Sequence, residues 1–221
     1  MKKEERRIES FDKIKFKDFG TLILTQGDQA SLTIEADEEL LDQLISEVRG
    51  GTLVLGVDDD WLNRIGTVIS SLFSNGNHKV VYHLTFVDLK KIGVSGQCNL
   101  ECASLQTDTL DVSISGLGDL NFDHLNCDRL DVSISGRGEF NAAGRVKHQQ
   151  IRISGSGEYR APELASDSLR IVVSGQGNAT VRVENDLDIT ISGLGHVEYY
   201  GRPKLRQVIS GLGKTKRLNA D

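Results

Sequence analysis

Residues 110–118 read Leu-Asp-Val-Ser-Ile-Ser-Gly-Leu-Gly, and residues 130–138 repeat them as Leu-Asp-Val-Ser-Ile-Ser-Gly-Arg-Gly. Equivalent Ser-Gly steps recur at seven positions, 18 to 20 residues apart, and six of them continue as Ser-Gly-x-Gly. Their serines are Ser95, Ser115, Ser135, Ser154, Ser174, Ser192 and Ser210. A period near 20 indicates that the chain stacks equivalent structural units on one another.

Each unit contains two stretches in which apolar residues alternate with polar ones. Leu110, Val112 and Ile114 precede one Ser-Gly step, and Leu120 and Phe122 follow it. Such alternation is typical of strands with one buried face. A βαβ unit needs roughly 30 residues, which is more than one repeat offers. The sequence therefore predicts an all-β fold, a single-stranded parallel β-helix, which is right-handed by the usual crossover rule.

Thirteen of the 23 glycines occupy the two turn positions of the repeat. We expect them there because the turn needs either a positive φ or a close approach of the backbone. The serine is expected to hydrogen-bond to its own turn or to the serine of the next coil. A phosphate-binding glycine loop would need a helix directly after the glycines, and the sequence predicts none there.

We predict one domain over residues 1–221, with the regular coils in 79–221 and an irregular β segment and cap in 1–57. Within the cap, residues 37–48 place leucines at helical spacing and predict a short amphipathic helix. Residues 58–78 predict a helical insertion with one apolar stripe that includes Trp61, Ile65, Ile69 and Phe73. The stripe either packs on the rod or forms an interface with a partner subunit or a membrane, and the single tryptophan favours an interface.

The composition excludes some classes of partner. The 221 residues carry a net charge of −6, whereas a nucleic-acid-binding protein is expected to present a basic face. The sequence contains no run of 18 apolar residues, so it predicts no membrane span. The first residues show no secretion signal, so the protein is cytoplasmic or is a mature chain without its signal. The three cysteines are expected to be buried free thiols and not a disulfide framework or a zinc site.

Several marks together resemble the GIN-domain family, the head domains of proposed auto-transporter adhesins. They are residues 7–14 (RIESFDKI), the Gln26-Gly27-Asp28 turn, residues 40–53, the Ser-Gly-x-Gly coils and residues 200–203 (YGRP). The resemblance implies a β-helical fold and export to the bacterial cell envelope, often as a lipoprotein. The chain differs from the family in the insertion at 61–73 and in having no visible signal or lipobox cysteine.

One set of polar residues is expected to stack along the rod. The residues four positions after the first six serines are Asn99, Asp119, Glu139, Glu158, Asn178 and His196, and two positions further on are Glu101, Asn121, Asn141, Arg160 and Thr180. On a β-helix they would form an outward stripe that is either ordinary surface or a binding site for a glycan or a cation such as calcium. Carboxylates about 5 to 9 Å apart could also hydrolyse a glycoside.

These observations predict a non-enzymatic envelope or surface-binding module whose ligand is a glycan or a surface protein. Its candidate binding residues are Asn99, Asp119, Glu139, Glu158 and Asn178, and we assign no catalytic residue, metal or cofactor. One alternative is a polysaccharide-active enzyme that uses Asp119, Glu139 and Glu158. Another is a structural module that assembles into homo-oligomers through residues 61–73.

Overall fold

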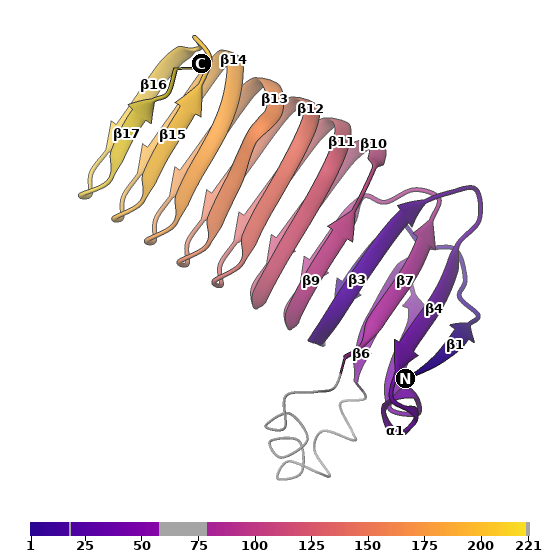
Figure 1. Cartoon of the computed structure of the whole chain (residues 1–221). Helices are drawn as coiled ribbons and strands as arrows, with labels where there is room; N and C mark the ends of the chain where they lie inside the picture. The colour runs from indigo at the N-terminus through magenta and orange to yellow at the C-terminus, as the bar shows by residue number, and fades with distance from the viewer. Residues whose placement is uncertain (18, 58–78, 220–221) are drawn as a thin grey trace.

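The computed structural model describes residues 1–17, 19–57 and 79–219. The chain forms an all-β rod of stacked coils (Figure 1). Each regular coil runs along one face, turns at the Ser-Gly step and returns along a second face. Register-equivalent residues of successive coils pair in parallel, as Leu110 pairs with Leu130. The predicted parallel β-helix is therefore confirmed.

The strands that precede the turns form what we call the first face. From β6 to β16 the neighbours on this face pair in parallel. In stacking order they are β6 (Thr52–Val57), β2 (Lys13–Phe16), β8 (Lys91–Val94), β10 (Leu105–Ile114), the later parts of β11 (Leu117–Ile134), β12 (Glu139–Ile153), β13 (Glu158–Val173) and β14 (Asn178–Ile191), and β16 (Lys204–Ile209).

The strands that follow the turns form the second face, which is also parallel throughout its regular part. In stacking order they are β7 (Val81–Phe86), β3 (Phe19–Gln26), β9 (Gln97–Cys102), the earlier parts of β11, β12, β13 and β14, β15 (His196–Tyr200) and β17 (Lys214–Arg217). The long strands β11 to β14 continue from the second face around a corner to the first face of the next coil, so the corner and the Ser-Gly turns lie on opposite edges (Figure 1).

The order of the coils in space differs from their order in the sequence. The coil made by β2 and β3 lies between the β6–β7 coil and the β8–β9 coil. Ile14, for example, has Leu53 as its register partner on one side and Ile92 on the other. Strands β2 and β3 therefore form a coil inside the stack, although they precede the neighbouring coils in the sequence.

An antiparallel cap closes the N-terminal end of the rod. On the second face, β4 (Ser31–Ala36) pairs with β7 and β1 (Lys2–Arg6) pairs with β4, both antiparallel. On the first face, β5 (Leu44–Arg49) pairs antiparallel with β6. The four-residue helix α1 (Glu38–Leu41) follows β4. This arrangement covers sheet edges that would otherwise be open to pairing with other chains.

The helix predicted over residues 37–48 is wrong beyond its first turn. The chain leaves the helix after Leu41 and forms β5, which makes a hairpin with β6. Gly50 and Gly51 form the turn with φ of 56° and 73°. Two consecutive positive φ values match the twist of a tight hairpin, which outweighs a weak helical pattern. The apolar residues of this segment fit both periods, so spacing alone could not distinguish helix from strand.

The turn glycines are required by close packing between coils and not by a left-handed backbone. None of the thirteen has a positive φ. A Cβ placed on Gly136 would lie 2.1 Å from the carbonyl oxygen of Gly116, its equivalent one coil earlier. The serines make neither expected contact: the Ser115 hydroxyl donates to the carbonyl of Val94, 3.2 Å away in the preceding coil.

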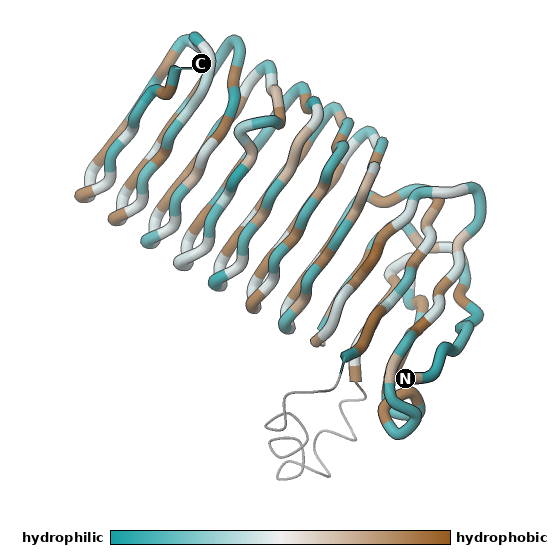
Figure 2. The backbone as a smooth tube through the Cα atoms, in the orientation of Figure 1, coloured by the Kyte–Doolittle hydropathy of each residue, from teal (hydrophilic) through white to brown (hydrophobic). Residues whose placement is uncertain are grey.

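The core is a continuous column of buried apolar side chains between the two faces. The alternation of hydrophobic and hydrophilic residues is visible along the strands in Figure 2. The rings of Phe122, Phe140 and Tyr159 pack in sequence, with centroids 5.4 and 5.1 Å apart. Cys98, Cys102 and Cys127 are free and buried, as expected, and burial raises the pKa of each thiol to about 12.

One polar pair interrupts this column. The Tyr159 hydroxyl donates to Gln149 Oε1 at 2.7 Å, and Gln149 occupies the position that Leu130 and Leu169 hold in the adjacent coils. Gln149 Nε2 is buried without a hydrogen-bond partner among the described residues. A buried polar group that loses its partner costs about 1–3 kcal/mol, whereas replacing both partners with apolar groups is nearly neutral.

We expect Gln149→Leu and Tyr159→Phe each to lower the free energy of unfolding by about 1–3 kcal/mol. The double variant is expected to be as stable as the wild type or more stable, because it restores an apolar pair. Urea unfolding of the four proteins measures the coupling between the two sites. Additive losses in the double variant would contradict the interpretation of these residues as an isolated buried pair.

Candidate functional site

The five residues predicted to bind a ligand lie in one row on the outer side of the second face. Successive members are register partners in adjacent coils, in the order Asn99, Asp119, Glu139, Glu158 and Asn178. Because paired strands are about 4.8 Å apart, the row repeats polar groups at that interval along the rod. We call this row the polar ladder.

Two carboxylates of the polar ladder are held by an arginine. Arg160 donates from Nη1 to Glu139 Oε1 at 2.8 Å and from Nη2 to Glu158 Oε2 at 2.6 Å. The pKa of Arg160 is raised, mainly by its hydrogen bond to Glu158. Both carboxylates therefore contact the same guanidinium, which holds them side by side on adjacent coils.

A second row of polar residues lies two positions further along each strand. It contains Glu101, Asn121, Asn141, Arg160 and Thr180, of which the first four line hollows. Asn141 Nδ2 donates to Asn121 Oδ1 at 2.9 Å between adjacent coils. This hydrogen bond is one step of a side-chain ladder, which stabilises stacked strands. It also fixes the two amides where the second face approaches the corner.

A shallow groove runs beside this second row. Two hollows of 340 and 270 Å³ share Asn121 and Asp123, so together they cross five consecutive coils, from β3 to β13. We call them the corner groove. The side chains along it are Ile23, Thr25, Glu101, Ala103, Asn121, Asp123, Asn141, Ala143, Arg160, Pro162 and Glu163. The groove combines amides, charges and small residues, and its length follows the axis of the rod.

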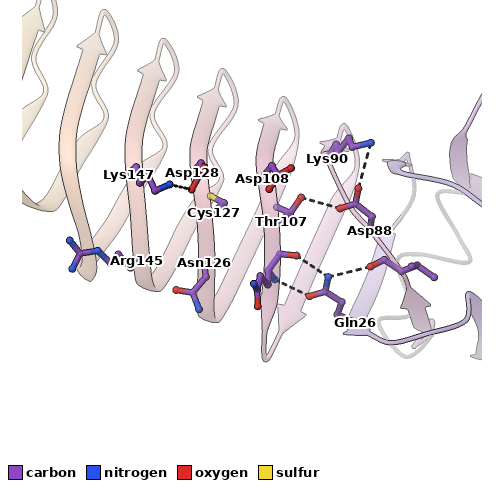
Figure 3. Close-up of a pocket in the computed structure, with 12 residues that line it drawn as sticks. Gln26, Asp88, Lys90, Thr107, Asp108, Asn126, Cys127, Asp128, Arg145 and Lys147 are labelled. Carbon is purple, nitrogen blue, oxygen red and sulfur yellow. Dashed lines mark hydrogen bonds and ion pairs between the residues drawn. The ribbon is translucent and has the colours of Figure 1, made fainter.

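A larger cavity of 740 Å³, which we call the corner pocket, lies on the other side of the corner (Figure 3). Gln26 bridges its N-terminal end. Gln26 Nε2 donates to the carbonyls of Val87 at 3.2 Å and Gln106 at 2.9 Å, and Gln26 Oε1 accepts from the Gln106 amide at 2.9 Å. These bonds join segments that lie 61 and 80 residues apart in the sequence.

The corner pocket is lined by charges of both signs, three aspartates and three basic residues. Asp128 lies between Asp108 and Lys147 in the register of its neighbours, and Lys147 Nζ is 2.7 Å from Asp128 Oδ1. The hydrogen bond with Asp128 raises the pKa of Lys147. At the N-terminal end of the pocket, Lys90 Nζ lies 3.5 Å from Asp88 Oδ2. Mixed charges and amides of this kind offer donors and acceptors to a polar ligand and no excess of either sign.

Sequence reasoning located the polar ladder and the second row beside it, but it missed the corner groove as a hollow and the corner pocket altogether. The 20-residue recurrence of Asp88, Asp108 and Asp128 was a usable signal for the pocket. The contribution of Gln26 had no such signal, because it depends on where the β2–β3 coil inserts. The proposed interface residues Trp61, Ile65, Ile69 and Phe73 lie outside the described residues. Within the described part of the chain, no three His, Cys, Asp or Glu side chains group as a metal site.

No helix among the described residues is long and apolar enough to cross a membrane. Several crystal structures share the fold, among them the following three. A putative adhesin from Bacteroides fragilis NCTC 9343 is 23% identical, with a TM-score of 0.86 over 98% of this chain and 96% of that one. A putative lipid binding protein from Parabacteroides distasonis ATCC 8503 is 22% identical, with a TM-score of 0.70 and the same coverage. A putative adhesin from Parabacteroides merdae ATCC 43184 is 19% identical, with a TM-score of 0.66 over 98% and 95%.

No curated protein matches the chain. A family model described as "Putative auto-transporter adhesin, head GIN domain" matches residues 10–203, which include the corner groove, six of the seven Ser-Gly steps and all of the antiparallel cap except β1. The structural neighbours, all below 25% identity, support the fold alone, whereas the family match covers most of the sequence. The chain therefore belongs to the family of GIN-domain adhesin heads.

Proposed function

We propose that this chain is a non-enzymatic surface-binding module of the cell envelope that holds an extended glycan along the corner groove and the adjacent polar ladder. The observation that carries the proposal is the continuity of the groove over five coils, with register-equivalent polar side chains beside it. A repeating site suits a repeating polymer, because each coil can present a similar group to successive sugar units. The adhesin family supports a location at the bacterial surface.

The ion pairs of two ladder carboxylates with Arg160 support binding without catalysis. Glu139 and Glu158 share the guanidinium of Arg160, which orients them and neutralises part of their charge. The amides of Asn121 and Asn141 retain donor and acceptor capacity beyond their mutual hydrogen bond. Such groups recognise sugar hydroxyls. The alternative of a polysaccharide-active enzyme would use the same carboxylates, and the alternative of a module that assembles through residues 61–73 concerns residues outside the described part of the chain.

The test is a panel of bacterial and host polysaccharides, with and without calcium, scored for retention and for released product. We expect retention without cleavage. Asn121→Ala and Arg160→Gln are expected to weaken binding about tenfold each, since a hydrogen bond to a charged or well-placed partner contributes roughly 1.5 kcal/mol. Arg170→Gln is the matched control, because Arg170 is exposed on the same strand, β13, but on the first face.

Three results would contradict the proposal. Release of shortened product would favour the polysaccharide-active enzyme, in which case Glu139→Gln should abolish turnover. Equal binding by the groove variants and the Arg170→Gln control would place the ligand elsewhere on the rod. Failure of every glycan to bind would direct attention to a protein ligand and to residues 61–73.

A further inference from the structure

A separate hollow of 290 Å³ lies on the first face, where β6, β2, β8 and β10 lie side by side. Lys13, Lys15 and Lys91 line it, together with the hydroxyls of Thr52 and Ser113. We call it the lysine hollow. It is remote from the corner groove because the two faces point away from each other, so a ligand here would be independent of the proposed glycan.

Gly93 opens the lysine hollow. It lies between Lys15 and Ser113 in the register of three adjacent strands. A Cβ at this position would meet the Ser113 Oγ at 3.4 Å and the Ile14 carbonyl oxygen at 3.8 Å, which are ordinary contacts. Unlike the turn glycines, Gly93 is therefore not required by backbone packing. Its missing side chain leaves a space next to the Ser113 hydroxyl, in a hollow that the three lysine side chains also line.

Three lysines lie close together here, and the repulsion between their positive charges is unfavourable. Lys13 and Lys91 are direct register partners on adjacent strands, and Lys15 projects from the same face two residues along. Like charges directly opposite each other in a sheet are destabilising. Lys91 is paired with Asp111 at 3.1 Å and Lys13 approaches Asp12 at 3.8 Å. Lys15 makes no ion pair within the described residues, so one positive charge is not compensated.

We propose that the lysine hollow binds a phosphate ester. The ammonium group of Lys15, unpaired among the described residues, is available to an oxyanion, the long side chains of Lys13 and Lys91 can reach the same ligand, and charge-assisted hydrogen bonds of this kind are the strong ones. The volume of 290 Å³ is roughly ten times that of one water in the liquid, so the site also accommodates a small polar group attached to the phosphate. The source of the ester is either a soluble molecule or the headgroup of a lipid, and both present the same chemistry.

The first arm of the test uses soluble probes. Glycerol 1-phosphate and inorganic phosphate are titrated into the ¹⁵N-labelled full chain at constant chloride, and amide shifts are followed by NMR. We expect saturable shifts at Gly93, Ser113 and Lys15. Lys15→Gln is expected to weaken binding about tenfold, as the loss of one charge-assisted bond predicts. Gly93→Val should abolish it by filling the hollow, with the side chain that Val172 carries at the equivalent position.

The second arm uses flotation with vesicles of phosphatidylcholine, with and without phosphatidylglycerol. Binding that needs phosphatidylglycerol, is absent with soluble probes and is lost in Lys15→Gln and Gly93→Val would identify a lipid headgroup. Arg170→Gln, which removes a charge further along the same face, is the control and should behave as wild type in both arms. The proposal is overturned if no saturable shift appears around Gly93 and flotation does not distinguish the variants from the control. Because no variant here touches the corner groove, this outcome is separate from failure of the glycan proposal.

Discussion

Replacing Gly136 with alanine is expected to lower the free energy of unfolding by about 3 kcal/mol, the upper range for inserting atoms into a packed interior. The new Cβ would lie 2.1 Å from the Gly116 carbonyl oxygen and 2.8 Å from that of Ser115. Both obstacles are backbone atoms, so no side-chain rotation relieves them. Separating the two coils would break the inter-coil hydrogen bonds from Ser135 to Ile114 at 2.9 Å and from Arg137 to Gly116 at 3.2 Å.

Urea unfolding followed by far-ultraviolet circular dichroism measures this effect, and Gly93→Ala is the matched control. The control adds the same methyl group to a strand of the same rod, but its nearest neighbour is the Ser113 Oγ at 3.4 Å. We expect the control to change stability by less than about 1 kcal/mol, because no close contact is created. Equal losses in the two variants would show that the cost comes from glycine's conformational freedom and not from the spacing of the coils.

Truncation of Phe140 to alanine is expected to cost about 3–5 kcal/mol. Phe140 is fully buried, and its ring is stacked on Tyr159 with an interplanar angle of 4° and a centroid distance of 5.1 Å. On the other side its centroid is 5.4 Å from that of Phe122. Removal of the ring therefore leaves a cavity between two aromatic neighbours in the middle of the rod. In a stacked repeat protein this weakens the interfaces on both sides of the altered coil.

The control for Phe140→Ala is Tyr200→Ala, which removes a half-buried aromatic side chain from an outward position. Tyr200 contacts the Arg182 guanidinium at 5.1 Å from its ring centroid, and we expect a loss of about 1 kcal/mol. Urea unfolding and hydrogen exchange of both variants provide the comparison. If the Phe140→Ala variant unfolded at the same urea concentration as the control, the aromatic column would not be the main stabilising element of the central coils.

Much of the regular part of the rod follows from local patterns. The alternation around residues 110–122 assigns each side chain to the inside or the outside, because a strand repeats every two residues. The repeat length aligns equivalent residues of successive coils, which is why the polar ladder from Asn99 to Asn178 was predictable as a row. Neither pattern contains information about which coils are neighbours when the chain departs from sequential order.

The sequence by itself determined the β-helical class, the two faces, the positions of the turns and the outward ladder. Only the tertiary structure decided that β2 and β3 insert between later coils, that residues 44–49 form a strand, and that Lys13 and Lys15 meet Lys91. The physical reason is that parallel backbone pairing is nearly the same for any two strands of suitable pattern. The choice of neighbour depends on the fit of side chains brought together from distant parts of the chain, and the lysine hollow arises from that fit.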